Sequence, residues 1–301
     1  MAHPARPGRH YPLRLGMAPT MTSPPLVSVI VATRNEERNI VRILRDLKMQ
    51  TYPKIEVIVV DNESTDRTRE LAAGEDGVSV YHLPEHVDLE GVMNFRGAQV
   101  NFGVTQAKGD IVFYPDADMT FERGLVADAV ALLDDHDALF IPEVVMGDGF
   151  FGAIRRFERS FYNMTCIDAP RFVRRPLFDR VGGFDTKNIP FAPDDWDLHK
   201  TLRKADARFA ITTAVEYHHE EWMTLSVYLG KKGDYTHAIE PYVRKWGADD
   251  PDVKRQLGVG YRFFGVFTEN GKWKRLLTRP DLAIGMYALR FLVGVMYLLR
   301  R

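Results

Sequence analysis

Short apolar runs alternate with helical patterns along the first half of the chain. Runs of branched apolar residues, each typical of a buried strand, lie at residues 26–32, 55–60, 78–83 and 110–114. Helical patterns follow them at residues 37–47, 64–73, 96–107 and 125–133. Strands that alternate with helices predict an α/β fold with a doubly wound, mostly parallel sheet flanked by helices.

Polar residues gather where three of these predicted strands end. They occupy residues 33–36, 61–66 and 116–118. Because ligands of such sheets bind at the carboxyl ends of the strands, these loops predict a ligand site at that edge.

The second half of the chain is less regular. Residues 150–163 interleave aromatic and basic side chains, and residues 194–204 predict a helix that opens with three aspartates. A strand predicted at residues 209–213 leads to the pair His218 and His219.

The last predicted element is an apolar tail. Residues 282–299 are apolar except for Arg290, and basic residues flank them on both sides. As a helix the tail would span about 27 Å, at about 1.5 Å per residue, against a bilayer core of about 30 Å. A central arginine is costly inside a membrane. We therefore expect a helix that lies in the membrane plane or inserts partly.

Composition narrows the function classes. The chain has 301 residues and a formal net charge of −1, which offers no electrostatic attraction to nucleic acid. Its single cysteine, Cys166, excludes an internal disulfide and a zinc–cysteine cluster. Residues 1–24 are rich in proline and arginine, lack the apolar stretch of a secretory signal, and predict a disordered arm.

Asp116 and Asp118 are the first candidates for chemistry. They follow the strand predicted at residues 110–114 and stand two residues apart, so both can reach one divalent cation. Hard oxygen ligands suit Mg²⁺ or Mn²⁺, and such an ion neutralises a departing diphosphate. The alternative is a solvated turn in which Asp118 caps a helix.

Asp61 also stands at a strand end. It could accept hydrogen bonds from a nucleotide base, or it could organise its own loop. Ser64 and Thr65 are expected to cap the helix that follows.

Three carboxylates surround Trp196, and two histidines follow the last predicted strand. Asp194, Asp195 and Asp197 favour the positive end of a helix dipole. One of them could instead be a general base, since crowded and partly buried carboxylates have raised pKa values. His218 or His219 could be a metal ligand or an ordinary surface or core residue.

Five segments in this order resemble family 2 glycosyltransferases of the GT-A fold. Each segment alone is a weak indicator of the family, but the five in this order are a specific one. Together they cover roughly residues 25–230. They are VSVIVATRNEERNI (residues 27–40), VIVVDNESTDRT (57–68), GDIVFYPDADM (109–119), GGFDTKNIPFAPDDWDL (182–198) and YHHEEWMTL (217–225).

The resemblance implies a nucleotide-sugar site at the predicted sheet edge. Four residues would lie along the nucleotide of a UDP- or GDP-sugar, with Asp61 near the base; they are Thr33, Asn35, Glu36 and Asp61. Asp116 would contact the donor as well, and with Asp118 it would form the Asp-x-Asp pair that binds Mn²⁺ or Mg²⁺.

The resemblance also implies the catalytic base and a further metal ligand. Asp195 matches the second acid of the family's Glu-Asp motif, the base, while Asp194 stands where glutamate is usual. The late histidine that completes the metal shell would be His218, or His219 if the register differs by one. The implied mechanism is inversion by a single displacement.

Two rival functions compete with this one: the first stays open and the second is disfavoured. A membrane-attached, non-catalytic protein that binds sugar nucleotides or acts as a scaffold is the main alternative. A nucleotidyltransferase is disfavoured, because no glycine-rich phosphate loop follows the strand predicted at residues 26–32.

The C-terminal third resembles a membrane-associated subgroup that glycosylates polyprenyl-linked intermediates. The acceptor would then be a glycan or a polyprenyl-linked intermediate, and the enzyme would work at the cytoplasmic face of the membrane. Lys232 and Tyr235 could meet a lipid phosphate, as could Arg155, Arg156 and Arg159. The equal alternative is surface charge beside packed aromatic side chains.

The expected domain organisation has three parts. The disordered arm at residues 1–24 precedes a GT-A domain at residues 25–230. This domain divides into a nucleotide-binding half, 25–120, and an acceptor and catalytic half, 121–230. Residues 231–301 form a helical extension that associates with the membrane surface.

Overall fold

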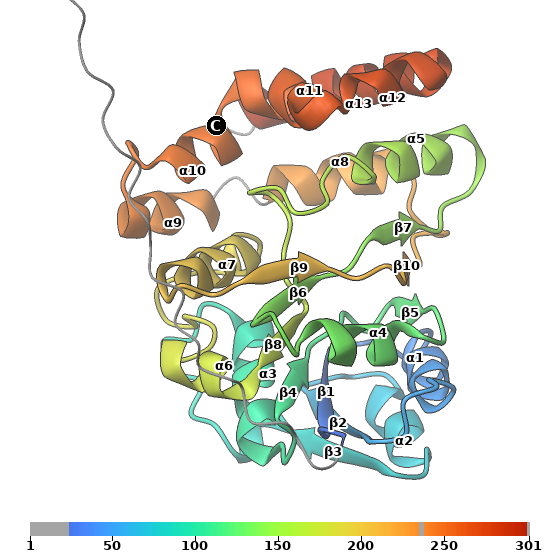
Figure 1. Ribbon diagram of the computed structural model, residues 1–301, viewed down its shortest axis with the longest axis vertical. Coiled ribbons are helices and arrows are strands. Elements are labelled where there is room, and N and C mark those ends of the chain that lie inside the picture. The colour runs from blue at the N-terminus through green and yellow to red at the C-terminus, as the bar shows by residue number, and fades with distance from the viewer. Residues whose placement is uncertain (1–23, 235–237, 300–301) are drawn as a thin grey trace, which may run out of the picture.

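The computed structural model describes residues 24–234 and 238–299 (Figure 1). Its central sheet has seven strands, and most neighbouring pairs are parallel; only β8 runs antiparallel to both of its neighbours. In spatial order the strands are β3 (Val78–His82), β2 (Ile55–Asp61), β1 (Val27–Thr33), β4 (Ile111–Phe113), β8 (Phe172–Arg174), β6 (Ala138–Phe140) and β9 (Phe209–Ile211).

A smaller sheet adjoins the central one. Its strands, in spatial order, are β5 (Met119–Phe121), β10 (Glu216–His218) and β7 (Glu143–Val145). β10 pairs antiparallel with β5 and parallel with β7. This sheet places the end of β10 beside the loop that follows β4.

Helices cover both faces of the central sheet. On one face lie α1 (Ile40–Lys48), α2 (Thr68–Ala73) and α4 (Leu125–Leu132); on the other lie α3 (Phe95–Gln106), α6 (Arg175–Val181) and α7 (Asp194–Lys204). Side chains alternate along β1, so Val29 faces α1 while Ile30 faces α3. Gly103 lets α3 approach β1 closely, because a Cβ there would lie 2.4 Å from an Ile30 methyl carbon. The predicted α/β fold, mostly parallel and flanked by helices, is confirmed.

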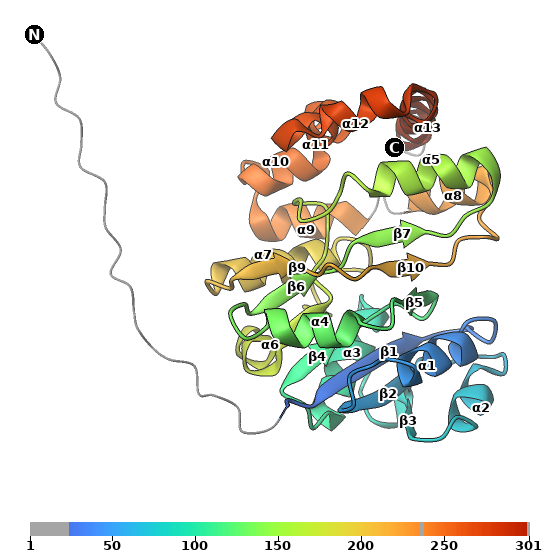
Figure 2. The same ribbon diagram turned by 45° about the vertical axis from the view of Figure 1, so that its right-hand side comes forward.

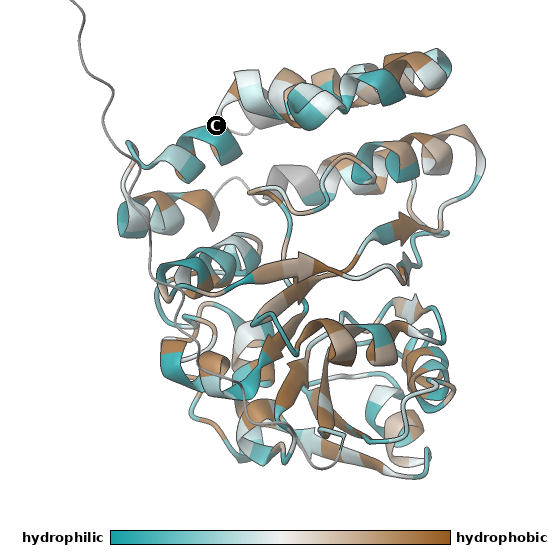
Figure 3. Cartoon of the chain, in the orientation of Figure 1, coloured by the Kyte–Doolittle hydropathy of each residue, from teal (hydrophilic) through white to brown (hydrophobic). Residues whose placement is uncertain are grey.

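Further helices form a layer at the end of the molecule away from β3 (Figures 1 and 2). They are α5 (Gly149–Arg159), α8 (Leu225–Asp234), α9 (Ile239–Trp246), α10 (Pro251–Leu257), α11 (Val266–Thr268), α12 (Trp273–Thr278) and α13 (Pro280–Leu299). Short turns of other helix types are η1 (Leu83–Glu85), η3 (Tyr261–Gly265) and η4 (Glu269–Gly271). α11, α12 and α13 lie outermost, and α13 packs on α5 and α8. Brown apolar stretches mark the buried strands in Figure 3.

One predicted helix begins later than expected. α2 starts at Thr68, and its first turn has no side-chain cap from Ser64 or Thr65. The Ser64 hydroxyl donates to Asp61, and the Thr65 amide donates to Asn35. The capping prediction for these two residues is wrong, because both bind the loops at the strand ends.

The apolar tail is a structural part of the fold. α13 buries Met286 and Leu289 together with Arg290, in a cluster that includes Phe161 and Phe267. Across residues 24–234 and 238–299, no helix is both long enough and apolar enough to cross a membrane. The predicted arm at residues 1–24 lies outside the described residues except for its last residue.

Candidate active site

The ends of β1 and β2 are tied together at the predicted nucleotide edge. The Thr33 hydroxyl donates to Asp61 across the two strand ends, at 3.3 Å. Asp61 is fully buried; it accepts a bond from the Ser64 amide at 3.1 Å, and Arg69 lies 3.6 Å away. The Asp61 carboxylate therefore organises its own loop, which was one of the two roles considered for it.

The loop after β1 is held by the loop after β2. Asn35 has a positive φ of 57°, and its side chain accepts a bond from the Thr65 amide at 2.8 Å. The Glu36 amide donates to the Thr68 hydroxyl at 2.7 Å. Burial raises the pKa of the Glu36 carboxyl, a hydrogen bond from Asn39 opposes it, and the charges of Asp118 and Asp116 raise it further. Glu36 thus lies within the field of the Asp-x-Asp pair.

Asp116 lies beside the end of β1, where it forms a bridge with Ala32. Arg96 Nε donates to Asp116 Oδ1 at 2.8 Å, and Arg171 Nη2 donates to Oδ2 at 3.0 Å. Burial acts to raise the pKa of Asp116, but Arg171 and Arg96 outweigh it and hold the pKa below its ordinary value. Asp116 is therefore a carboxylate whose charge two guanidinium groups neutralise.

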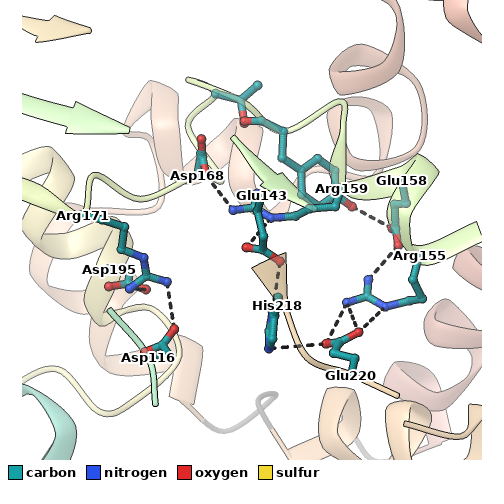
Figure 4. A network of polar contacts seen from close by, with 12 residues as sticks. Asp116, Glu143, Arg155, Glu158, Arg159, Asp168, Arg171, Asp195, His218 and Glu220 are labelled. Carbon is teal, nitrogen blue, oxygen red and sulfur yellow. Dashed lines mark hydrogen bonds and ion pairs between the residues drawn. The ribbon is translucent and has the colours of Figure 1, made fainter. Parts of the chain in front are cut away.

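Asp195 shares the same two arginines. Its Oδ1 lies 3.3 Å from Arg96 Nη1, and its Oδ2 lies 3.5 Å from Arg171 Nη1. Figure 4 shows Arg171 between Asp116 and Asp195. Both carboxylates keep an accessible part, since their side chains are 32% and 22% exposed. The structure thus brings Asp116 and Asp195 into one site; with Asp194 and the two arginines they are called the open cluster below.

The three aspartates at the start of α7 have different environments. Asp194 is buried and accepts bonds from Asn94 Nδ2 at 3.0 Å and from Arg96 at 3.4 Å. Burial and the neighbouring Asp195 charge raise the pKa of Asp194 to about 6. Asp197 is buried too and accepts bonds from Trp246 and Lys245. Of the three, only Asp195 presents an accessible carboxylate to the site.

His218 at the end of β10 points toward Asp118. Its Nε2 lies 3.2 Å from Asp118 Oδ2. On the other side of the ring, its Nδ1 lies 3.0 Å from Glu143 Oε1 on β7 (Figure 4). Burial opposes a charged imidazole, but Asp118 and Glu143 outweigh it and raise the pKa of His218. His219 bonds instead to Thr120 and Glu221. The structure therefore places His218, rather than His219, at the predicted site.

Asp118 and His218 fit a divalent cation as a pair of ligands. Glu143 can accept only, so it holds the proton on Nδ1 and leaves Nε2 facing Asp118. In the part of the chain that the structure describes, no three His, Cys, Asp or Glu side chains converge as a metal site. Asp116 does not join the pair, because Arg96 and Arg171 hold its carboxylate. A cation here would take its other ligands from a bound diphosphate and water, as Mg²⁺ commonly does.

Sequence reasoning missed three residues that build this site. Arg96, Arg171 and Glu143 contact the predicted aspartates and histidine, yet each partner is distant in sequence. No local pattern identifies such partners, since the sheet topology brings them together.

A second group of charges lies next to His218, mainly on α5, on β7 and just after β10 (Figure 4). Arg155 pairs with Glu158 at 3.1 Å and with Glu220 at 3.2 Å, and Arg159 pairs with Glu143 at 2.7 Å. This sealed cluster comprises Glu143, Arg155, Glu158, Arg159, Asp168, Glu220 and Arg290.

The sealed cluster changes the predicted lipid-phosphate contacts. Arg155 and Arg159 are expected from the sequence to be able to meet a lipid phosphate, but both are engaged in these ion pairs. That expectation is wrong for these two residues. Arg156 donates to the backbone of Val145, and the side chains of Lys232 and Tyr235 lie outside the described residues.

Comparison with known proteins identifies the family. The family model "Glycosyl transferase family 2" matches residues 28–194, which include the strand-end loops and reach the start of α7. Glycosyltransferase AglE of Haloferax volcanii is 30% identical over 208 residues, which are 63% of this chain and 64% of that protein. A beta-monoglucosyldiacylglycerol synthase of Nostoc sp. is 25% identical over 250 residues, 72% of this chain and 50% of the synthase. The chain thus spans less than two thirds of each relative.

A solved structure supports the fold assignment. The mannosyltransferase PcManGT from Pyrobaculum calidifontis, in complex with GDP-Man and Mn²⁺, superposes with a TM-score of 0.58 at 22% identity. The match covers 94% of this chain and 90% of that one. The chain therefore belongs to glycosyl transferase family 2 and has the GT-A fold.

Proposed function

We propose that the protein is an inverting glycosyltransferase that moves a sugar from a nucleoside-diphosphate sugar to an acceptor hydroxyl. The observation that carries the proposal is the open cluster. Asp116 and Asp195 share Arg96 and Arg171 at the carboxyl edge of the sheet. The pair Asp118 and His218 lies next along the same edge.

Asp195 is the base of the proposed reaction. It takes the proton from the acceptor hydroxyl, and the oxygen then attacks the anomeric carbon from the face opposite the diphosphate. Its pairs with Arg96 and Arg171, at 3.3 and 3.5 Å, are longer than those of Asp116, so Asp195 can exchange them for a substrate hydroxyl. Arg96, Arg171 and Asn94 orient Asp195 and its neighbour Asp194 at the start of α7.

Asp118 and His218 would hold Mn²⁺ or Mg²⁺. A bound cation supplies charge neutralisation for the departing diphosphate. Support comes from the donor set of one carboxylate and one oriented imidazole, and from the presence of Mn²⁺ in the PcManGT complex.

The donor lies along the loops after β1 and β2 in this proposal. Thr33, Asn35, Glu36 and Asp61 border its nucleotide, which is UDP or GDP. The GDP-Man in the PcManGT complex supports a nucleotide-sugar donor. Because Asp61 already accepts three hydrogen bonds from its own loop and from Thr33, it would act mainly by shaping the loops that border the nucleotide.

The acceptor in this proposal is a glycan or a polyprenyl-linked intermediate. The name of the Nostoc relative, a beta-monoglucosyldiacylglycerol synthase, supports a lipid-borne acceptor or product. The nucleotide-binding half remains residues 25–120 and the acceptor half residues 121–230. The catalytic groups come from both, with Asp116 in one half and Asp195 in the other.

The test compares donor binding with donor turnover. A thermal-shift panel of nucleotides and nucleotide sugars, each with Mn²⁺ or Mg²⁺, should reveal one donor that raises Tm through binding to the folded state. The same donor should release its nucleoside diphosphate in the presence of the cation. Binding without turnover, with any acceptor tried, would favour the non-catalytic binding or scaffolding protein.

A further inference from the structure

The outer face of α13 is apolar and exposed. Ile284 and Phe291 are 72% and 65% exposed, and Ala288 lies between them on the same face. The opposite face buries Leu282, Met286 and Leu289. A helix that is apolar on both faces buries one face in its own protein and offers the other to something apolar.

Arg290 fixes which face of α13 looks outward. It is only 7% exposed, and its Nη2 lies 2.9 Å from Glu158 Oε1 on α5. Its guanidinium carbon also lies 4.8 Å from the centre of the Phe267 ring. Turning Ile284 inward would pull this arginine away from its buried partner, which is costly. The outward position of Ile284 and Phe291 is therefore built into the fold.

Neighbouring elements extend this face. A Cβ at Gly285 would lie 3.4 Å from Phe150, which is the second residue of α5 and is itself exposed. The Phe264 ring lies 6.2 Å from that of Tyr287 on α13, and Leu277 is 70% exposed at the end of α12. These residues form the docking face, which comprises Phe150, Phe264, Leu277, Ile284 and Phe291.

Positive charge accompanies the docking face. Residues 272–299 contain five lysines and arginines against one aspartate. Two of these cations do not belong to the face, because Arg290 is buried against Glu158 and Lys272 pairs with Glu269.

Lys274 and Arg275 are exposed on α12 shortly before Leu277. Arg279, where α12 meets α13, pairs with Asp281 at 2.7 Å. Exposed aromatic and aliphatic side chains beside lysine and arginine are typical of helices that lie in an anionic membrane surface.

We propose that the docking face binds the surface of a lipid bilayer that carries anionic headgroups, with α13 in the membrane plane. Ile284 and Phe291 would enter the acyl boundary while Lys274 and Arg275 meet the headgroups. A second copy of the chain is a poorer occupant, because a two-fold interface would bring the same cations together. The proposal does not depend on glycosyl transfer, since binding to a membrane requires neither donor nor base.

Removing the tail is a poor test, because it would also remove Met286, Leu289 and Arg290 from the core. Point variants on the exposed face avoid this. The double variant Ile284→Glu/Phe291→Glu should weaken binding to phosphatidylcholine–phosphatidylglycerol vesicles by about tenfold or more in co-sedimentation. Met49→Glu, an exposed methionine just past the end of α1, is the matched control and should bind like wild type.

The lipid composition tests the charge. Wild type should bind vesicles of phosphatidylcholine alone more weakly than mixed vesicles, and Lys274→Glu should reduce this preference. Equal binding of wild type and the double variant would overturn the proposal, as would no binding to mixed vesicles. A wild-type dimer in sedimentation velocity that the double variant turns into a monomer would assign the face to a second copy. Donor turnover without membrane, measured on both proteins, keeps this outcome separate from that of the proposed function.

Discussion

The molecule contains two groups of buried arginines that pair with carboxylates, and the two groups differ in how far those carboxylates are exposed. In the open cluster, Arg96 and Arg171 hold Asp116 and Asp195, whose carboxylates remain 32% and 22% exposed. In the sealed cluster, no carboxylate side chain is more than 7% exposed; the carboxylates are Glu143, Glu158, Asp168 and Glu220.

This difference in exposure separates a candidate active site from a cluster that stabilises the fold. The sealed cluster ties α13 to α5 through Arg290 and Glu158, and reaches β10 through Glu220. Its carboxylates are enclosed and paired with arginines, which is typical of a structural cluster. His218 connects the sealed cluster to Asp118, because Glu143 binds one side of its ring and Asp118 the other. We therefore expect variants of the open cluster to alter chemistry and variants of the sealed cluster to alter stability.

The largest effect is expected from Asp195→Asn in the open cluster. Asparagine keeps the shape of the side chain but cannot take the acceptor proton, so turnover should fall by about 10²- to 10⁴-fold. Donor binding, measured by calorimetry with Mn²⁺, should stay within a few-fold of wild type, because Asp195 acts on the acceptor side. If affinity and turnover fell together, Asp195 would belong to the donor site and would not be the base.

Arg155→Met should chiefly affect stability. The substitution removes the buried ion-pair partner that Glu158 and Glu220 share. Such a loss typically lowers the free energy of unfolding by about 3–5 kcal/mol. Urea denaturation measures this loss. The control is Arg67→Met on α2, whose ion pair with Glu70 lies at the surface and should contribute little. A stable Arg155→Met protein with lost turnover would place the sealed cluster in the active site.

Glu143→Gln tests the residue through which the sealed cluster contacts His218. Glutamine still accepts a bond from His218 through its amide oxygen, but it loses the charge that holds the imidazole and Arg159. Changes of this kind next to a metal ligand typically cost about 10- to 100-fold in affinity. Electron paramagnetic resonance of Mn²⁺ titrated with the protein measures it without any turnover. Unchanged Mn²⁺ affinity would separate Glu143 from the metal pair.

The smallest effect on stability at neutral pH is expected from His199→Phe, next to the sealed cluster. His199 packs edge-on against Phe140 and Phe209. Burial, aided by Arg203, lowers its pKa from 6.5 to about 4. Between these two pH values the unfolded chain binds a proton that the folded protein refuses, so wild type loses stability as pH falls. The loss reaches about 3 kcal/mol when the pH has fallen to about 4.

Phenylalanine cannot be protonated, so the variant should lose less stability than wild type across this window. Thermal melts at a series of pH values between 7 and about 4 measure the difference. Parallel curves for the two proteins would mean that His199 does not carry this acid sensitivity.

Much of the fold follows from local sequence pattern, whereas the site follows only in part. Apolar runs such as residues 55–60 are long and regular, so they identify strands whose ends carry the polar loops. Asp116 and Asp195 are identifiable because motifs surround them. Arg171 and Glu143 are not, because they meet their partners only through strand pairing across the two sheets. The sequence likewise does not show which face of α13 points outward, since the Arg290–Glu158 pair, which fixes how the helix is turned, is seen only in the structure.

The central claim is that Asp118, His218, Asp116 and Asp195 face one bound donor. A crystal structure of the protein with Mn²⁺ and the nucleoside diphosphate chosen by the thermal-shift panel tests it most directly, through the anomalous signal of the metal. The account predicts one manganese peak against Asp118 and His218, with the diphosphate beside it and Asp195 across the sugar site. A peak elsewhere, or a nucleotide bound away from the ends of β1 and β2, would contradict it.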